Sequence, residues 1–192
     1  MKIIKQQYPF LHLDLENFFT TEQNNEIYNI CTNALDVEKY NSRELFLIDD
    51  EYDTAVGMLG LDISEEISNT IKNNLKNISD YLNIQGVWQY CMNVSNPDGY
   101  LGPHNDDYNV NKFSNPGAGV IKVLIYIGEL DKDYTNYGTK LYNNNLEFIK
   151  EVSYIPGNGL AFTPNKDSYH GTDFKGKLNN YRFILGAELT YA

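Results

Sequence analysis

The sequence predicts an α+β fold in which two helices precede a double-sheet jelly roll. Two amphipathic helical stretches lie in the first 85 residues, and from residue 86 onward short strand-like runs alternate with turn signals. So many antiparallel strands close most readily as two packed sheets, which leave few edges exposed. We therefore expect one domain over residues 1–192, with helical support in 1–85 and a jelly-roll core that carries the functional site in 86–192.

Both expected helices begin at a residue that can cap the first turn. The first follows Thr20, whose hydroxyl can accept from the backbone while Gln23 reaches back, as in a capping box. Its apolar positions fall at helical spacing, at Ile27, Ile30, Cys31 and Ala34. The second spans about 64–82, with Asp62 or Ser64 as its cap, and its apolar residues recur every three or four positions. We expect both helices to serve as scaffold.

The expected strands are separated by turns that contain proline and glycine. Asn-Pro-Asp-Gly occupies 96–99, Asn-Pro-Gly occupies 115–117 and Pro-Gly-Asn-Gly occupies 156–159. Proline supplies the fixed φ, and glycine the positive φ, that tight turns require. The strands are expected at 86–94, 119–127, 138–142, 146–154, 159–162 and 181–191.

Composition favours a globular protein from a reducing compartment. Apolar residues make up 42% of the chain. No apolar run approaches the roughly 18 residues that span a bilayer, and the first residues lack the pattern of a signal peptide. The two cysteines, Cys31 and Cys91, lie far apart in sequence and do not form a disulfide framework. We expect a cytoplasmic protein without a membrane segment.

The charge balance bears on the class of partner. The formal net charge is −11, and an acidic surface repels the phosphate backbone of nucleic acids. Nucleic acid is therefore disfavoured as the main partner, whereas a small-molecule or peptide substrate is favoured.

Two of the three histidines lie in sequence contexts typical of a metal site. His104 and Asp106 are separated by one residue, so an extended backbone directs both side chains to the same face. His170 follows later, in Ser-Tyr-His-Gly, just before the last expected strand. Two imidazoles and one carboxylate form the facial triad of non-haem iron(II) oxygenases, which leaves positions open for a co-substrate and oxygen.

Arg182 completes the pattern. Its apolar neighbours indicate a half-buried strand, where an unpaired guanidinium is costly. A planar, permanently charged fork in such a place suits a carboxylate, and the carboxylate of 2-oxoglutarate that lies far from the metal is a candidate. Alternatively, Arg182 pairs with Glu188 or Asp173 and stabilises the sheet.

The histidine and aspartate motifs also have structural interpretations. A His-x-Asp pair is common in loops, and a histidine before glycine is often a turn residue. Asp107 competes with Asp106 as the ligand, although strand alternation directs Asp107 to the opposite face. The third histidine, His12, lies between two leucines and is interpreted as a core or surface residue.

Taken together, these residues resemble the 2-oxoglutarate/Fe(II)-dependent dioxygenase superfamily, in its prolyl-4-hydroxylase-like branch. The resemblance covers roughly residues 88–191. The matching segments are 99–107 around the first histidine, the apolar strand 120–129, and the stretches 137–142, 156–162 and 181–185. The family's Gly-Gly pair is here the single Gly138, and Ile184 replaces a serine found in some relatives.

The resemblance implies a double-stranded β-helix and assigns roles to residues of this chain. The iron(II) ligands would be His104, Asp106 and His170. Arg182 would bind the distal carboxylate of 2-oxoglutarate, with Tyr126 donating a hydrogen bond to it and Asn93 as a further contact. Oxygen would be the second co-substrate, with ascorbate as an optional addition. The expected reaction hydroxylates an unactivated C–H bond of a prolyl or other peptidyl residue and releases succinate and CO2.

Other functions share part of this pattern. A hydroxylase of free amino acids or other small molecules would carry the same triad. A nucleic-acid demethylase of the superfamily would need a basic face, against which the net charge speaks. A non-catalytic, cupin-like module would bind a metal for structure, but it normally supplies more histidines than this chain contains. Iron-dependent consumption of 2-oxoglutarate separates the enzymes from the binding module.

Overall fold

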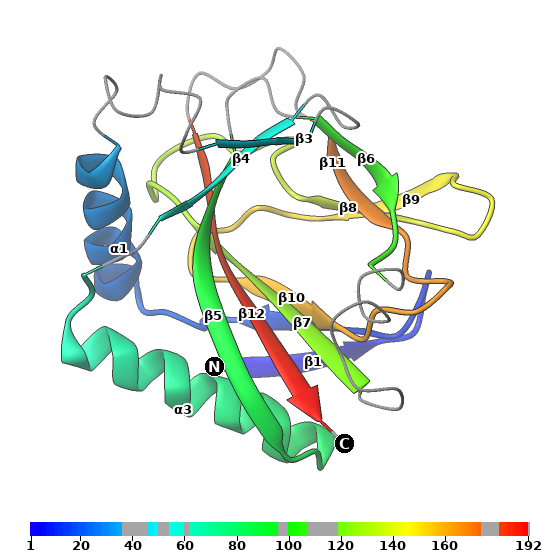
Figure 1. The fold of residues 1–192 in the computed structure, drawn as a ribbon, viewed down its shortest axis with the longest axis horizontal. Helices are drawn as coiled ribbons and strands as arrows, with labels where there is room; N and C mark the ends of the chain where they lie inside the picture. Colours follow the sequence, from blue (N-terminus) through cyan, green and yellow to red (C-terminus); the bar gives the residue numbers. More distant parts are fainter. Residues whose placement is uncertain are drawn as a thin grey trace.

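Two antiparallel β-sheets and two helices make up the part of the chain that the computed structural model describes, namely residues 1–35, 46–49, 54–59, 62–95, 100–106, 119–173 and 181–191 (Figure 1). The helices are α1 (Thr21–Ala34) and α3 (Glu65–Leu82). The strands are β1 (Lys2–Gln6), β2 (His12–Glu16), β3 (Phe46–Asp49), β4 (Thr54–Leu59), β5 (Gly86–Ser95), β6 (Tyr100–His104), β7 (Gly119–Ile127), β8 (Thr139–Tyr142), β9 (Phe148–Val152), β10 (Gly159–Phe162), β11 (His170–Asp173) and β12 (Arg182–Tyr191).

The larger sheet has the order β1-β2-β10-β7-β12-β5-β4-β3, and the smaller has the order β6-β11-β8-β9. The last strand, β12, pairs with β5 along its whole length, from Arg182 opposite Ser95 to Tyr191 opposite Gly86. Its other edge pairs with β7. The centre of the larger sheet is therefore built from the three longest strands, β5, β12 and β7.

Both helices begin where the sequence predicts. Thr20 caps α1, and the reciprocal bonds of a capping box with Gln23 are present. Ser64, not Asp62, caps α3 by accepting from the backbone N–H of Ile67. No helix in the described ranges is both long and apolar enough to cross a membrane.

Strand alternation divides the larger sheet into two faces. On β5, Met92 and Val94 point into a core shared with the stripes of α1 and α3, which cover this outer face (Figure 1). A second core lies between the two sheets and contains Tyr126, Leu160, Phe162 and Ile184 from the larger sheet with Leu141 from β8. Residues that alternate with Met92 and Val94, such as Asn93, therefore face the space between the sheets.

The strand predictions for the second half are confirmed, with small changes at the ends. The bounds 119–127 and 159–162 agree with β7 and β10, and β9 is shorter than the expected 146–154. Two short strands that the sequence analysis did not name, β6 and β11, carry the two histidines of the expected metal site.

The first 85 residues provide more than the expected helical support. Strands β1 and β2 extend the larger sheet beyond β10, and β3 and β4 extend it beyond β5. In β2 the alternation is visible, since Leu13 and Leu15 pack against the helices while His12 and Asp14 face the other side. The sequence does not predict this strand, because five residues give a weaker periodic signal than an eighteen-residue helix.

Candidate metal centre

His104 and His170 face each other across neighbouring strands. In the register of β6 and β11 they are direct partners, and their ring centroids lie 4.4 Å apart. Gly171 permits this close pairing, because a Cβ at that position would lie 2.6 Å from the carbonyl oxygen of Leu101. Asp106 follows the end of β6 and brings its carboxylate to the same place.

The potential ligand atoms of the three residues all lie within 4.8 Å of one another. Asp106 Oδ1 lies 3.7 Å from His104 Nε2, and Asp106 Oδ2 lies 3.4 Å from His170 Nε2. The structure thus brings His104, Asp106 and His170 together, while their role as metal ligands stays a prediction. The rival ligand Asp107 lies outside the described residues.

Hydrogen bonds orient both imidazoles toward this centre. His104 Nδ1 lies 2.9 Å from the carbonyl oxygen of Gly102, and His170 Nδ1 lies 3.1 Å from that of Ser168. A carbonyl can only accept, so the ring proton belongs on Nδ1 in each case. The Nε2 lone pairs are then directed at the shared centre, which is the arrangement a metal requires.

Burial and nearby charges set the protonation states of the centre. Burial lowers the pKa of His170 to about 4, so this imidazole is neutral at neutral pH. For Asp106, burial alone raises the pKa, but His170, Lys122 and His104 outweigh it, and the pKa lies below its usual value. The centre therefore combines a neutral nitrogen donor with an ionised carboxylate, the forms that bind a cation.

A cavity of about 230 Å³ runs from this centre between the two sheets. Its polar lining comes from both sheets, with His104, Asp106, Thr139, Thr172 and His170 on one side and Asn93, Ser95, Lys122 and Arg182 on the other. Phe162 and Ile184 supply apolar walls. The cavity thus has metal-ligating groups and a buried guanidinium on the same lining.

Arg182 is 5% exposed and is held in place by its neighbours. Its Nε donates to the carbonyl oxygen of Tyr137 at 2.9 Å, and its Nη2 donates to Thr139 Oγ1 at 3.4 Å. The rings of Tyr126 and Tyr154 lie 5.8 and 5.6 Å from its guanidinium carbon. The suggested partner Glu188 instead forms an ion pair with Lys122.

Tyr126 and Asn93 differ in their relation to the cavity. Tyr126 is fully buried, and its hydroxyl donates to Thr139 Oγ1 at 2.9 Å. Burial raises the pKa of Tyr126 to about 12, so the phenol keeps its proton. Thr139 lines the cavity and Tyr126 does not, whereas Asn93 lines it from β5. The co-substrate contacts expected of Tyr126 and Asn93 remain predictions.

Lys122 and Thr139 are the site residues that sequence reasoning missed. Lys122 Nζ lies 3.1 Å from Asp106 Oδ2 and 3.1 Å from Glu188 Oε1. In the sequence, Lys122 could have been noticed as the single charged residue within the apolar run of β7. Thr139 gave no comparable signal, because a threonine in a strand is ordinary.

Comparison with known proteins supports the fold. The chain matches no family model and no curated protein sequence. Among solved structures it is similar to a Pseudomonas putida prolyl-4-hydroxylase, with a TM-score of 0.65 at 10% identity over 94% of this chain and 92% of the other. A viral collagen prolyl hydroxylase from Paramecium bursaria Chlorella virus-1, in a 2-oxoglutarate complex, gives 0.56 at 12% identity over 94% and 96%.

A third structure is a Trichoplax adhaerens prolyl hydroxylase bound to a peptide fragment of hypoxia inducible factor. It gives a TM-score of 0.55 at 15% identity, over 94% of this chain and 83% of the other. The chain shares the fold of these hydroxylases. The expected resemblance is therefore confirmed at the level of structure, over nearly the whole chain instead of residues 88–191.

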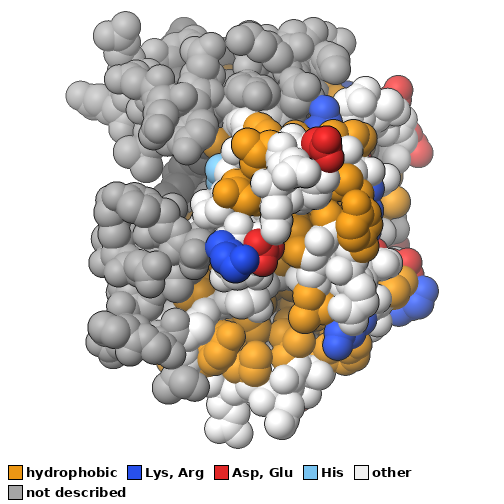
Figure 2. Space-filling view, turned by 90° about the vertical axis from the view of Figure 1, so that its right-hand side faces the viewer, with side chains coloured by type: hydrophobic (Ala, Val, Ile, Leu, Met, Phe, Trp, Pro, Cys, Tyr) orange, Lys and Arg blue, Asp and Glu red, His pale blue; other side chains and the backbone are white. Residues whose placement is uncertain are grey.

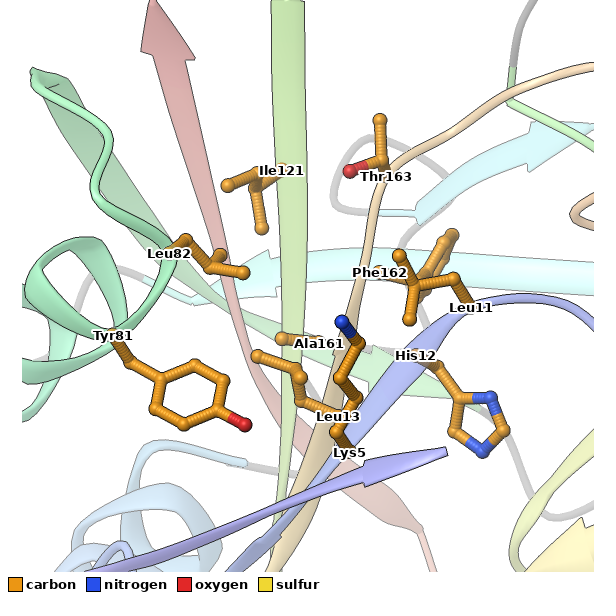
Figure 3. Close-up of a pocket in the computed structure, with 10 residues that line it drawn as sticks. All are labelled: Lys5, Leu11, His12, Leu13, Tyr81, Leu82, Ile121, Ala161, Phe162 and Thr163. Atoms are coloured by element: carbon orange, nitrogen blue, oxygen red, sulfur yellow. The ribbon is translucent and has the colours of Figure 1, made fainter. Parts of the chain in front are cut away.

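A second cavity, of about 260 Å³, lies near the end of α3 and is separate from the metal centre (Figure 3). Leu13, Leu82, Ile121 and Ala161 form its apolar wall, with Lys5 and Tyr81 pointing toward it. His12 belongs to its rim, but its ring is turned away from the cavity in Figure 3. The histidine is 1% exposed and contacts the carbonyl oxygen of Phe10 through Nδ1, so its interpretation as a core residue holds.

Proposed function

We propose that this protein is a non-haem iron(II) and 2-oxoglutarate-dependent dioxygenase on a double-stranded β-helix. The observation that carries the proposal is the convergence of His104, Asp106 and His170 on one cavity that Arg182 also lines. The donor set, two imidazole nitrogens and a carboxylate, fits iron(II) and leaves coordination positions open. The fold shared with prolyl hydroxylases is consistent with the same chemistry.

In this proposal the residues of the chain bind and orient the reactants. His104, Asp106 and His170 hold the metal, while Arg182 and Thr139 present N–H and O–H groups to the distal carboxylate of 2-oxoglutarate. Tyr126, whose hydroxyl donates to Thr139 Oγ1, and Asn93, which lines the cavity from β5, are the proposed further contacts of the co-substrate. When bound, the iron activates oxygen and couples the decarboxylation of 2-oxoglutarate to succinate and CO2 to hydroxylation of a C–H bond. The apolar walls limit access of water to the metal.

The proposed substrate is a prolyl or other peptidyl residue. The support is the peptide bound by the Trichoplax adhaerens hydroxylase, which is a property of that protein. A free amino acid or another small molecule is the alternative within the same enzyme class. A cupin-like module that binds metal without catalysis is the alternative outside it.

Anaerobic titration of the metal-free protein with iron(II) and then 2-oxoglutarate tests the proposal. A visible charge-transfer band should appear on addition of 2-oxoglutarate, and Asp106→Ala should abolish it. Ligand loss should weaken metal binding by more than the roughly 10- to 100-fold that loss of a supporting residue costs. Absence of the band in folded wild-type protein, or 2-oxoglutarate turnover by Asp106→Ala, would contradict the assignment.

A further inference from the structure

Lys122 lies between the cavity of the candidate metal centre and a third cavity that adjoins it. Asn93, Lys122 and Leu124 line both cavities. The adjoining cavity has a volume of about 500 Å³ and extends along β5 and β12, past Gly186, as far as Glu188. Among the described residues, Lys122 is therefore the charged side chain that lines both of these cavities.

Two carboxylates fix the ammonium of Lys122 beside the metal ligands. Asp106 Oδ2 and Glu188 Oε1 each lie 3.1 Å from Nζ. Glu188 is the cross-strand partner of Lys122 on β12, so the ladder itself sets this pair. The side chain of Lys122 is only 21% exposed, so its charge acts on the centre with limited screening by water.

Positive and negative side chains are mixed in the site before any ligand binds. Asp106 and Glu188 lie beside Lys122, and Glu151 acts on Arg182. Iron(II) alone adds two positive charges next to Lys122, and this repulsion opposes metal binding. A dianion such as 2-oxoglutarate offsets the two positive charges of the metal, so Lys122 should favour the co-substrate complex over the metal complex.

We propose that Lys122 is a further co-substrate-binding residue, whose ammonium binds the carboxylate of 2-oxoglutarate at the metal end while Arg182 binds the distal one. The proposal rests on the proposed function. It assigns Lys122 a role other than holding Asp106 in place, because a residue that only positioned Asp106 would support metal binding. A carboxylate on the primary substrate has the same chemistry and is distinguished by the test below.

The test separates the two binding steps by using manganese(II), which takes the same ligands without reacting with oxygen. Calorimetry measures manganese(II) affinity first and 2-oxoglutarate affinity of the manganese-loaded protein second. In Lys122→Met, 2-oxoglutarate should bind on the order of tenfold or more weakly, whereas manganese(II) should bind as well as or better than in the wild type. Lys122→Arg should restore 2-oxoglutarate binding.

Lys132→Met is the matched control. Lys132 also forms a 3.1 Å ion pair with a glutamate, Glu129, but it lines neither cavity. Neither affinity should change in this variant. If Lys122→Met does not fold, Lys122→Gln makes the same comparison.

The outcomes that overturn the inference differ from those that overturn the function. A parallel loss of manganese(II) and 2-oxoglutarate affinity would make Lys122 only a support for Asp106. Unchanged 2-oxoglutarate affinity in Lys122→Met would refute the inference and point to the primary substrate as the source of the carboxylate. Failure of the metal-loaded wild type to bind 2-oxoglutarate would remove the proposed function together with the inference.

Discussion

At the scale of single residues, the site depends on charged and polar groups that are withdrawn from water. Arg182 is buried, and burial lowers its pKa, although the neighbouring Tyr126 and Tyr154 oppose this effect. An arginine nevertheless stays protonated in proteins. In the proposed complex the distal carboxylate of 2-oxoglutarate accepts hydrogen bonds from this guanidinium.

Arg182→Met should separate co-substrate binding from metal binding. We expect 2-oxoglutarate to bind roughly ten- to a hundredfold more weakly, because a charged hydrogen bond contributes about 1.5–3 kcal/mol. Iron(II) affinity should be unchanged, since the described contacts of Arg182 do not include a metal ligand. Titration of both ligands measures the difference, and equal losses would argue against the role of Arg182.

His12 is a buried titratable residue outside the site, and a pH dependence of stability follows from it. Burial lowers its pKa below the ordinary 6.5, with Lys150 in the same direction, while the Phe10 carbonyl and Asp14 oppose the shift. The unfolded chain therefore binds this proton more readily than the folded one, and the free energy of unfolding should fall as pH drops below 6.5. Above that pH the contribution of His12 should be constant.

Chemical denaturation at several pH values checks this expectation. The slope of stability against pH in the mildly acidic range should be smaller in His12→Phe, whose ring keeps the edge contact with Phe10. An identical slope in the variant would show that His12 does not titrate on unfolding.

At the scale of elements, the candidate metal centre depends on the pairing of two short strands. β6 and β11 bring His104 opposite His170, and the register shifts between His170 and Thr172. The glycine at this irregularity, Gly171, lets the strands approach, because a Cβ there would lie 2.6 and 2.7 Å from the carbonyl oxygens of Leu101 and Gly102. The same Gly102 carbonyl orients His104.

Gly171→Ala should therefore damage both stability and metal binding. Forcing a methyl group against two backbone carbonyls should cost about 1–3 kcal/mol and should move the two histidines apart. Denaturant unfolding and iron(II) titration measure the two effects. Gly186→Ala serves as the control, because its Cβ would meet mainly the side-chain amide of Asn93; a similar loss of metal affinity in both variants would contradict this account.

At the scale of the whole molecule, the metal would join segments that lie far apart in the chain. His104 and Asp106 come from the end of β6, and His170 comes from β11, on the other side of β7 to β10 in sequence. On the face shown in Figure 2, basic, acidic and hydrophobic side chains of the described residues are interspersed.

Metal binding should raise the melting temperature, since only the folded chain brings the three ligands together. At a metal concentration about 100 times the dissociation constant, the expected stabilisation is about 2.7 kcal/mol. Thermal unfolding with and without a chelator measures it, and Asp106→Asn should lose most of the response. A chelator-independent melting temperature in the wild type would count against a metal site.

Local sequence signals determined several parts of this structure. Turn residues and short apolar runs located β7 and β10, and capping hydroxyls located the starts of both helices. Residue chemistry predicted that His104, Asp106 and His170 form a metal site, and these three residues lie together in the structure. These features depend on a few neighbouring residues, so a single sequence contains them.

Only the tertiary structure decided which distant segments meet. It added β1 to β4 to the larger sheet, placed Thr139 between Tyr126 and the cavity, and brought Lys122 to Asp106. Each of these depends on pairing between strands that are separated in the chain, and local periodicity does not encode the partner of a strand. The sequence alone therefore predicted the candidate metal ligands, whereas folding determined the charges and hydroxyls that surround them.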